Sequence, residues 1–195
     1  MPLPKLLQGL RIPVVGAPLF IISNPKLVIA QCTAGIVGSM PALNARPAEQ
    51  LDEWLAEITE TLAAWNRAHP ERPAAPFAIN QIVHKSNDRL EHDMQVCAKY
   101  KVPVVITSLG ARTDVNDAVH AWGGIVLHDI INNAFANKAI DKGADGLYTF
   151  RGGDQRSLFL VTDQGVIVTD PINASLAKAS RQAIAAIATV FSARM

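Results

Sequence analysis

Two polar residues stand where apolar runs of the sequence end, and they are the first candidates for chemistry. Asn80 ends the run Pro76–Ile79, and His128 follows the run Gly124–Leu127. A buried amide needs hydrogen-bond partners, which a bound ligand can supply. The alternative is an asparagine that caps a turn after a strand. For His128, the alternative to ligand binding is a structural or surface histidine, and both interpretations stay open.

The other reactive side chains do not form a recognisable site. His69, His92 and His120 lack the spacing of metal ligands, and we expect them to be solvated. Cys32 and Cys97 are far apart in the sequence. We therefore predict two buried thiols, a reducing compartment and no disulfide framework. No metal site is predicted.

Composition excludes several classes of protein. Of the 195 residues 49% are hydrophobic and 18% are charged, which is typical of a folded chain with a sizeable core. The net charge is +1, without the cluster of basic residues that nucleic-acid binding requires. The N-terminal residues do not resemble a signal peptide, and no apolar run is long enough to span a membrane. We expect a cytoplasmic protein without nucleic-acid or membrane partners.

Short apolar runs that alternate with helical patterns must position the candidate residues. Uniformly apolar runs are typical of strands that are buried on both faces of a parallel sheet. They occur at Pro13–Gly16, Gly35–Ser39, Phe77–Asn80, Val102–Thr107, Gly124–Leu127 and Gly146–Leu147. Helices are predicted after Asn24-Pro25, over Glu49–Asn66, after Ser86 and Thr113 as N-caps, and from Asn133 to Lys142 before Gly143.

This repeat fits either an open doubly wound sheet or a TIM (β/α) barrel. The first predicted strand is followed by Gly16–Leu19, which does not match the glycine-rich turn of dinucleotide-binding folds. A complete barrel needs about 250 residues for eight units. Residues 1–147 supply five units and the start of a sixth, so we predict an incomplete barrel with parallel strands.

The sequence pattern changes after Leu147. Two β-prone runs, Ser157–Thr162 and Val166–Asp170, are separated by a short turn that ends in Gly165, which predicts an antiparallel β-hairpin. A final helix is predicted after Asp170. The pair Gly152-Gly153 is interpreted as a turn between strands and not as a phosphate-binding loop. Residues 148–195 are therefore predicted to be a separate segment of hairpin plus helix.

Residues 1–147 resemble the nitronate monooxygenase family, formerly called 2-nitropropane dioxygenases. Several stretches carry the resemblance in the order of consecutive barrel strands. They are Ile12–Leu19, Gly35–Ser39, Phe77–Asn80, Val104–Ser108, Val126–Asp129 and Lys142–Gly146.

The resemblance implies an FMN-dependent oxidoreductase that uses molecular oxygen to convert an alkyl nitronate into a carbonyl compound and nitrite. Ala17, Pro18 and Leu19 would lie along the isoalloxazine ring of FMN. Asn80 would hydrogen-bond the flavin, and His128 would contact it. All of these residues follow predicted strands, on the side where barrel enzymes build their sites.

The sequence also departs from this family. The family's catalytic histidine lies in a glycine-rich loop after the sixth strand, where this chain has Tyr148–Gly153 without a histidine. The loops that hold the flavin phosphate follow strands seven and eight of such barrels, and we do not expect such strands within residues 1–195. No catalytic residue is assigned, and we expect activity to be impaired.

Residues 148–195 have a second resemblance, to the first strands of metallo-β-lactamase-fold hydrolases. Phe150–Gly153, Ser157–Thr162 and Gly165–Asn173 carry it. The zinc-binding motif of that family is absent, so Asp170 has no ligand to orient and is expected to cap the helix.

Three interpretations remain open from the sequence. The first is a nitronate-monooxygenase-like chain that arose by fusion or truncation near residue 147. The second is a catalytically inactive chain, and the third is a fragment of a related flavin barrel such as an enoyl reductase. Because an incomplete barrel leaves strand edges unpaired, self-association through these edges is expected.

Overall fold

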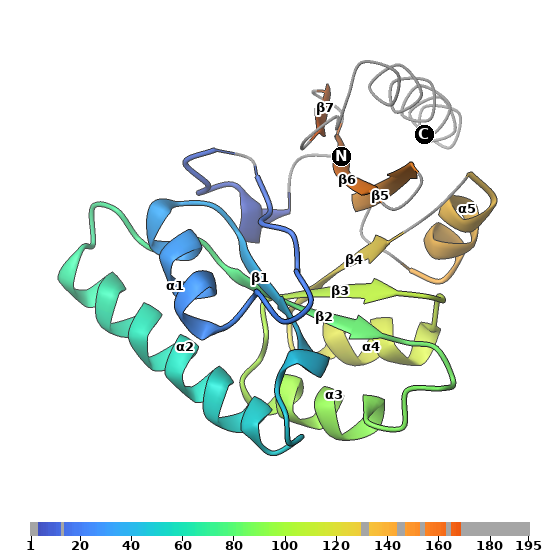
Figure 1. Ribbon diagram of the computed structural model, residues 1–195. Helices are drawn as coiled ribbons and strands as arrows, with labels where there is room; N and C mark the ends of the chain where they lie inside the picture. Colours follow the sequence, from blue (N-terminus) through green and yellow to red (C-terminus); the bar gives the residue numbers. More distant parts are fainter. Residues whose placement is uncertain are drawn as a thin grey trace.

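The fold is built on one open sheet, seen in a computed structural model that describes residues 4–12, 14–129, 133–143, 147–152, 155–162 and 165–168. In this part of the chain the sheet has seven strands in sequential order (Figure 1). They are β1 (Gly38–Pro41), β2 (Phe77–Ile82), β3 (Val104–Ser108), β4 (Ile125–Asp129), β5 (Leu147–Gly152), β6 (Gln155–Thr162) and β7 (Gly165–Val168).

The direction of strand pairing changes at β5. Each pair from β1 to β5 is parallel, whereas β5 with β6 and β6 with β7 are antiparallel. The predicted parallel strands and the predicted hairpin are therefore confirmed. The strands before and after the change of sequence pattern at Leu147 belong to the same sheet. The division into two domains stays a prediction.

Helices connect the parallel strands, as required for strands that run in the same direction. They are α1 (Pro25–Ala34), α2 (Gln50–Ala68), α3 (Leu90–Lys99), α4 (Thr113–Ala121) and α5 (Asn133–Asp141), with short 3-10 turns at Lys5–Leu7 and Ala42–Asn44. Among the described helices, none is both long and apolar enough to cross a membrane. The helix predicted after Asp170 lies outside the described residues.

Helix ends follow the sequence signals in most places. The side chain of Asn24 accepts a hydrogen bond from the Leu27 N–H, and Pro25 begins α1. Gly35 ends α1 with φ of 92°, a left-handed conformation that favours glycine. The predicted N-cap Ser86 is wrong, because the Ser86 N–H and hydroxyl bind His84 and the helix begins only at Leu90. The predicted N-cap Thr113 is wrong too, because Thr113 is the first residue of α4 and Arg112 occupies the cap position.

The first predicted strand is also shorter than expected. Val15 forms an isolated parallel bridge with Val37, and the Gly16 N–H donates to the Val37 carbonyl at 2.8 Å. The segment around Val15 therefore lies beside β1 and extends the series of parallel segments. Gly35–Val37 link α1 to β1 and are not part of the strand, because Gly35 still closes the helix.

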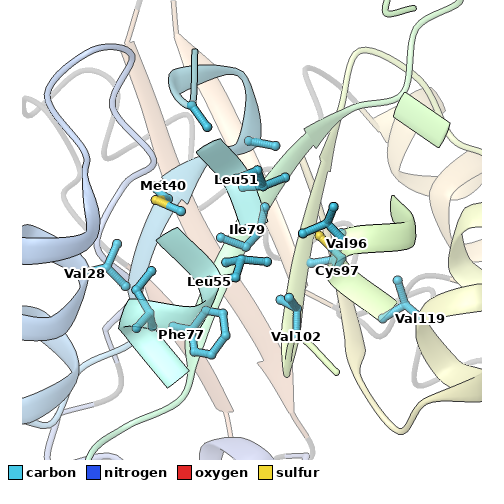
Figure 2. Packing of buried hydrophobic residues seen from close by; sticks show 14 of the residues in the cluster. Val28, Met40, Leu51, Leu55, Phe77, Ile79, Val96, Cys97, Val102 and Val119 are labelled. Atoms are coloured by element: carbon cyan, nitrogen blue, oxygen red, sulfur yellow. The ribbon is translucent and has the colours of Figure 1, made fainter. Parts of the chain in front are cut away.

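The two faces of the parallel sheet bury different amounts of apolar surface. The helix-covered face carries Ile79, Val105 and Val126 and packs against α1 to α4 in the main core (Figure 2). The opposite face carries Ala78, Val104, Ile106 and Leu127 in a smaller cluster that Leu7 and Val37 complete.

Candidate functional site

A row of buried polar side chains crosses the parallel strands and reaches their carboxyl ends at Asn80, Ser108 and His128, whereas Ser39 lies nearer the start of β1, in register with Ala78. Ser39, Asn80, Ser108 and His128 come from β1, β2, β3 and β4, and each is at most 7% exposed. In barrel enzymes this edge of the sheet holds the active site. The sequence predicted Asn80 and His128, whereas Ser39 and Ser108 were not singled out.

Strand register places these side chains on opposite faces of the sheet. Asn80 pairs with Ile106, and His128 pairs with Thr107. Successive residues of a strand point to opposite faces, so the neighbours Ile106 and Thr107 define two faces. Asn80 and Ser108 therefore share the face of Ile106, and His128 shares the helix-covered face with Thr107.

The amide of Asn80 is fixed by two neighbours on β3. Its Nδ2 donates to the Ile106 carbonyl at 2.9 Å and to Ser108 Oγ at 2.8 Å. Because the carbonyl can only accept, this bond fixes which end of the amide carries the hydrogens. Both hydrogens are thus used within the protein, and Asn80 can offer a ligand only its acceptor, Oδ1.

The segment that contains Ala17, Pro18 and Leu19 lies at the same edge. The Ser39 hydroxyl donates to the Gly16 carbonyl, and Ser39 is in register with Ala78 of β2. Because β1 lies between this segment and β2, which carries Asn80, the segment and β2 are about 10 Å apart across the sheet. This separation lets one ligand reach both sides.

Hydrogen bonds hold the loop after this segment in one conformation. Asn44 Nδ2 donates to the carbonyls of Leu19 and Ser23 at 3.0 and 2.8 Å, and Asn44 Oδ1 accepts from the Ile21 N–H. Ile21 has φ of 67°, which is strained for a β-branched residue. The loop nevertheless exposes 45% of Leu19 and 57% of Phe20. It is thus a fixed apolar surface beside the polar row.

His128 lies in a different environment from Asn80. Its Nδ1 contacts the Thr107 hydroxyl, and burial lowers the pKa of His128 to about 4, although the charge of Asp129 opposes this shift. The ring is therefore neutral near pH 7. It is built into the helix-covered face, away from the face that presents Asn80, and its predicted contact with a cofactor stays a prediction.

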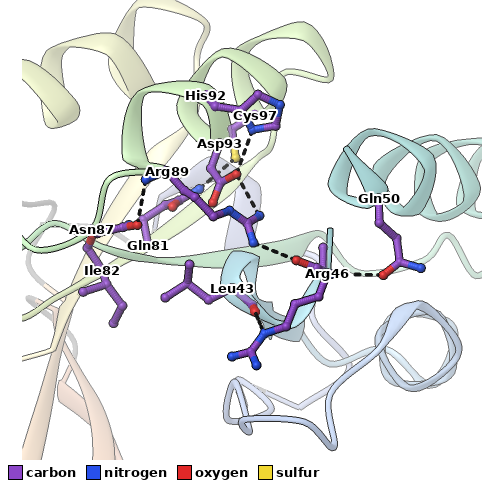
Figure 3. A network of polar contacts seen from close by, with 11 residues as sticks. Leu43, Arg46, Gln50, Gln81, Ile82, Asn87, Arg89, His92, Asp93 and Cys97 are labelled. Atoms are coloured by element: carbon purple, nitrogen blue, oxygen red, sulfur yellow. Dashed lines mark hydrogen bonds and ion pairs between the residues drawn. The ribbon is translucent and has the colours of Figure 1, made fainter. Parts of the chain in front are cut away.

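A partly buried polar network fixes the loop between β2 and α3 (Figure 3). Asn87 Nδ2 donates to the Ile82 carbonyl at 2.8 Å, and Arg89 Nη1 donates to the Ala45 carbonyl at 2.7 Å. Arg89 also forms an ion pair with the fully buried Asp93. These contacts anchor both α3 and the end of β2 next to the candidate site.

The described residues hold no group of three potential metal ligands from His, Cys, Asp or Glu. Cys32 and Cys97 are buried free thiols, as predicted, and burial raises their pKa values to about 11 and about 12. A groove of about 420 Å³ lies between α3 and α4, with Leu90, Met94 and Trp122 among its lining residues. Its lining includes neither Asn80 nor the segment after Gly16.

Comparisons with known proteins agree with the architecture. No family model and no curated protein matches the sequence. A structure of FabK from Thermotoga maritima is similar with a TM-score of 0.58 at 22% identity, over 72% of this chain and 40% of that chain. Nitroalkane oxidase from Streptomyces ansochromogenes is similar with a TM-score of 0.60 at 19% identity, over 72% of this chain and 46% of that chain.

These similarities establish the fold as part of a TIM barrel. The chain spans less than half the length of either structure. The resemblance of residues 148–195 to metallo-β-lactamase-fold hydrolases gains no support, and those residues are described only as part of β5, β6 and β7.

Proposed function

We propose that this chain is a nitronate-monooxygenase-like flavin barrel segment that binds FMN at the carboxyl edge of its parallel strands. The observation that carries the proposal is the buried Asn80 amide, whose Nδ2 is used by β3 and whose Oδ1 can accept from a ligand. The isoalloxazine ring has a ring N–H that fits such an acceptor. On the other side of β1 from Asn80, Ala17 and Leu19 supply an exposed surface for the flat face of the ring.

The proposed chemistry is the oxidation of a nitronate by oxygen to a carbonyl compound and nitrite, for which bound FMN would accept electrons. Asn80 would orient the ring, and residues 17–19 would shield one side of it. His128 is a second candidate for flavin contact. Because it is neutral and faces the helices, it fits a supporting role better than that of a charged group beside the flavin.

Flavin titration tests the proposal. We expect added FMN to lose fluorescence on binding, and Asn80→Ala to weaken its affinity about 10-fold, the usual effect of losing one buried hydrogen bond. Asn116→Ala is the matched control, because Asn116 is equally buried but bonds Lys142 from α4. Equal effects of both substitutions, or no binding by the unmodified chain, would reject the proposal.

An enoyl-reductase-type barrel is the second candidate function. The TM-scores of FabK and of nitroalkane oxidase, 0.58 and 0.60, are nearly equal, so the structural similarities do not favour either candidate function. An enoyl reductase needs a nicotinamide donor, whereas nitronate oxidation needs only oxygen. Oxidation of NADH that depends on an enoyl substrate would favour the second candidate.

Self-association is part of the proposal as well. The open sheet would leave backbone groups of its outer strands available for pairing with a second copy. Light scattering over a range of concentrations should then give a mass above that of one chain, 20.9 kDa. A constant mass of one chain would remove this part of the proposal.

A further inference from the structure

An exposed histidine lies in the loop that follows β2, four residues after Asn80. His84 Nδ1 accepts a hydrogen bond from the Ser86 N–H at 3.2 Å and contacts Ser86 Oγ at 2.8 Å. A backbone N–H can only donate, so Nδ1 holds a lone pair and not a hydrogen. In the neutral ring the hydrogen is therefore on Nε2.

The loop that carries His84 is anchored on both sides. The Val83 N–H donates to the Ser108 carbonyl at 3.0 Å, which ties the loop to the end of β3. The Asn87 N–H donates to the His84 carbonyl at 2.9 Å, and the Asn87 side chain binds the Ile82 carbonyl. His84 therefore belongs to the same strand ends as Asn80 and Ser108, on a loop with little freedom.

A second loop beside it has an unusual conformation. Leu109, directly after β3, has φ of 61° and is 58% exposed. Of the three described non-glycine residues with positive φ, Leu109 directly follows β3 and Ile21 lies in the loop after the segment that pairs beside β1, and both expose an apolar side chain. Strained residues of this kind cluster at ligand sites. The edge thus combines apolar loop tips with the Nε2–H donor of His84.

We propose that His84 is a substrate-binding residue that donates its Nε2–H to the negatively charged oxygen of a small, partly apolar oxyanion, such as a nitronate or a carboxylate. This inference rests on the proposed function. An N–H donor on an anchored loop can bind a charged oxygen without proton transfer, and such a bond is stronger than one between neutral groups. The apolar side chains of Leu109 and of the loop after Leu19 would contact the alkyl part.

The test uses butyrate, an unreactive carboxylate with the size and charge of propyl nitronate. It is titrated into the full chain, with and without FMN, while ¹⁵N-labelled imidazole signals are recorded. We expect the nitrogen shifts of His84 to show hydrogen on Nε2, and butyrate to move the His84 signals but not those of His120 on α4. Hydrogen on Nδ1, or equal movement of both rings, would overturn the proposal.

Two substitutions sharpen this result. His84→Ala should weaken butyrate binding about 10-fold, as expected for one hydrogen bond to a charged group, whereas His84→Gln should recover most of it because its amide also donates. Both variants should keep the FMN affinity of the unmodified chain, so a failure of FMN binding is recognised separately as a failure of the proposed function. Unchanged butyrate binding in His84→Ala would overturn the inference.

Discussion

The two faces of the sheet differ most at the carboxyl edge. On the helix-covered face, Gln81, Thr107 and His128 lie in register and bind partners within the protein, including Cys97 of α3. On the opposite face, Asn80 and Ser108 bind each other beside loops that expose apolar side chains. Burial alone therefore does not identify a ligand site, because polar residues are equally buried on both faces.

Catalysis gives the largest expected effect. Under the proposed function, turnover of propyl nitronate by the chain with added FMN should be about 100- to 10,000-fold below that of an intact nitronate monooxygenase, the usual contribution of a positioned proton-transfer group. No histidine follows His128 in the sequence to match the catalytic histidine of nitronate monooxygenases, and His128 itself faces the helices.

Oxygen consumption provides the measurement, with FMN alone as the control. Turnover equal to that of an intact enzyme would contradict the comparison of the two faces. It would require proton transfer by a residue on the open face or by His128 in spite of its orientation.

Core substitutions on neighbouring strands compare the stability of the two faces directly. Ile79→Ala on the helix-covered face should lower the free energy of unfolding by about 2 to 5 kcal/mol. Ile106→Ala should lie near the lower end of that range, because Ile106 belongs to the smaller cluster. Urea denaturation of both variants measures the difference, and equal losses would show that the open face is packed as tightly as the other.

The pH dependence of stability tests the environment of His128. Its pKa is about 4 in the folded chain against a usual 6.5. As the pH falls below about 6.5, the unfolded chain binds the proton first, so stability should decrease down to about pH 4, by about 3 kcal/mol. His128→Gln should remove this contribution in urea denaturation, and His120→Gln should not. Parallel pH curves for the unmodified chain and His128→Gln would contradict the buried, neutral state.

The smallest effect is expected at Ser108. Ser108→Ala removes one of the two acceptors of the Asn80 amide and should cost about 1 kcal/mol in the free energy of unfolding. The bond to the Ile106 carbonyl remains and keeps the amide in place. FMN affinity should therefore change less than in Asn80→Ala, and a larger change would mean that Ser108 itself contacts the ligand.

The sequence predicts the parallel part of the sheet well because each strand is uniformly apolar. Strand ends are also visible, since polar residues such as Asn80 interrupt these runs. The face of the sheet toward which a side chain points cannot be predicted, because a strand buried on both faces has no alternation between polar and apolar positions. The sequence favours Asn80 over His128 as a flavin contact only through the family resemblance, and the register with β3 places the two residues on opposite faces.

Loop geometry was also inaccessible from the sequence. His84 and Ser86 lie in a polar stretch without any motif, and Ser86 had the appearance of a helix cap. The proposed role of His84 depends on the Ser86 N–H, which donates to His84 Nδ1 in the folded loop. Ser108 could have been noticed as the polar residue that ends the run of β3, the same signal that identified Asn80.

The sequential strand order has a consequence for how the chain is made. Every strand from β2 to β7 pairs with the strand that precedes it in the chain. A ribosome delivers the chain from its N-terminus, and each emerging strand therefore finds its partner already synthesised. The sheet can grow one strand at a time during translation, and at each stage its growing edge is completed by the next segment to leave the exit tunnel.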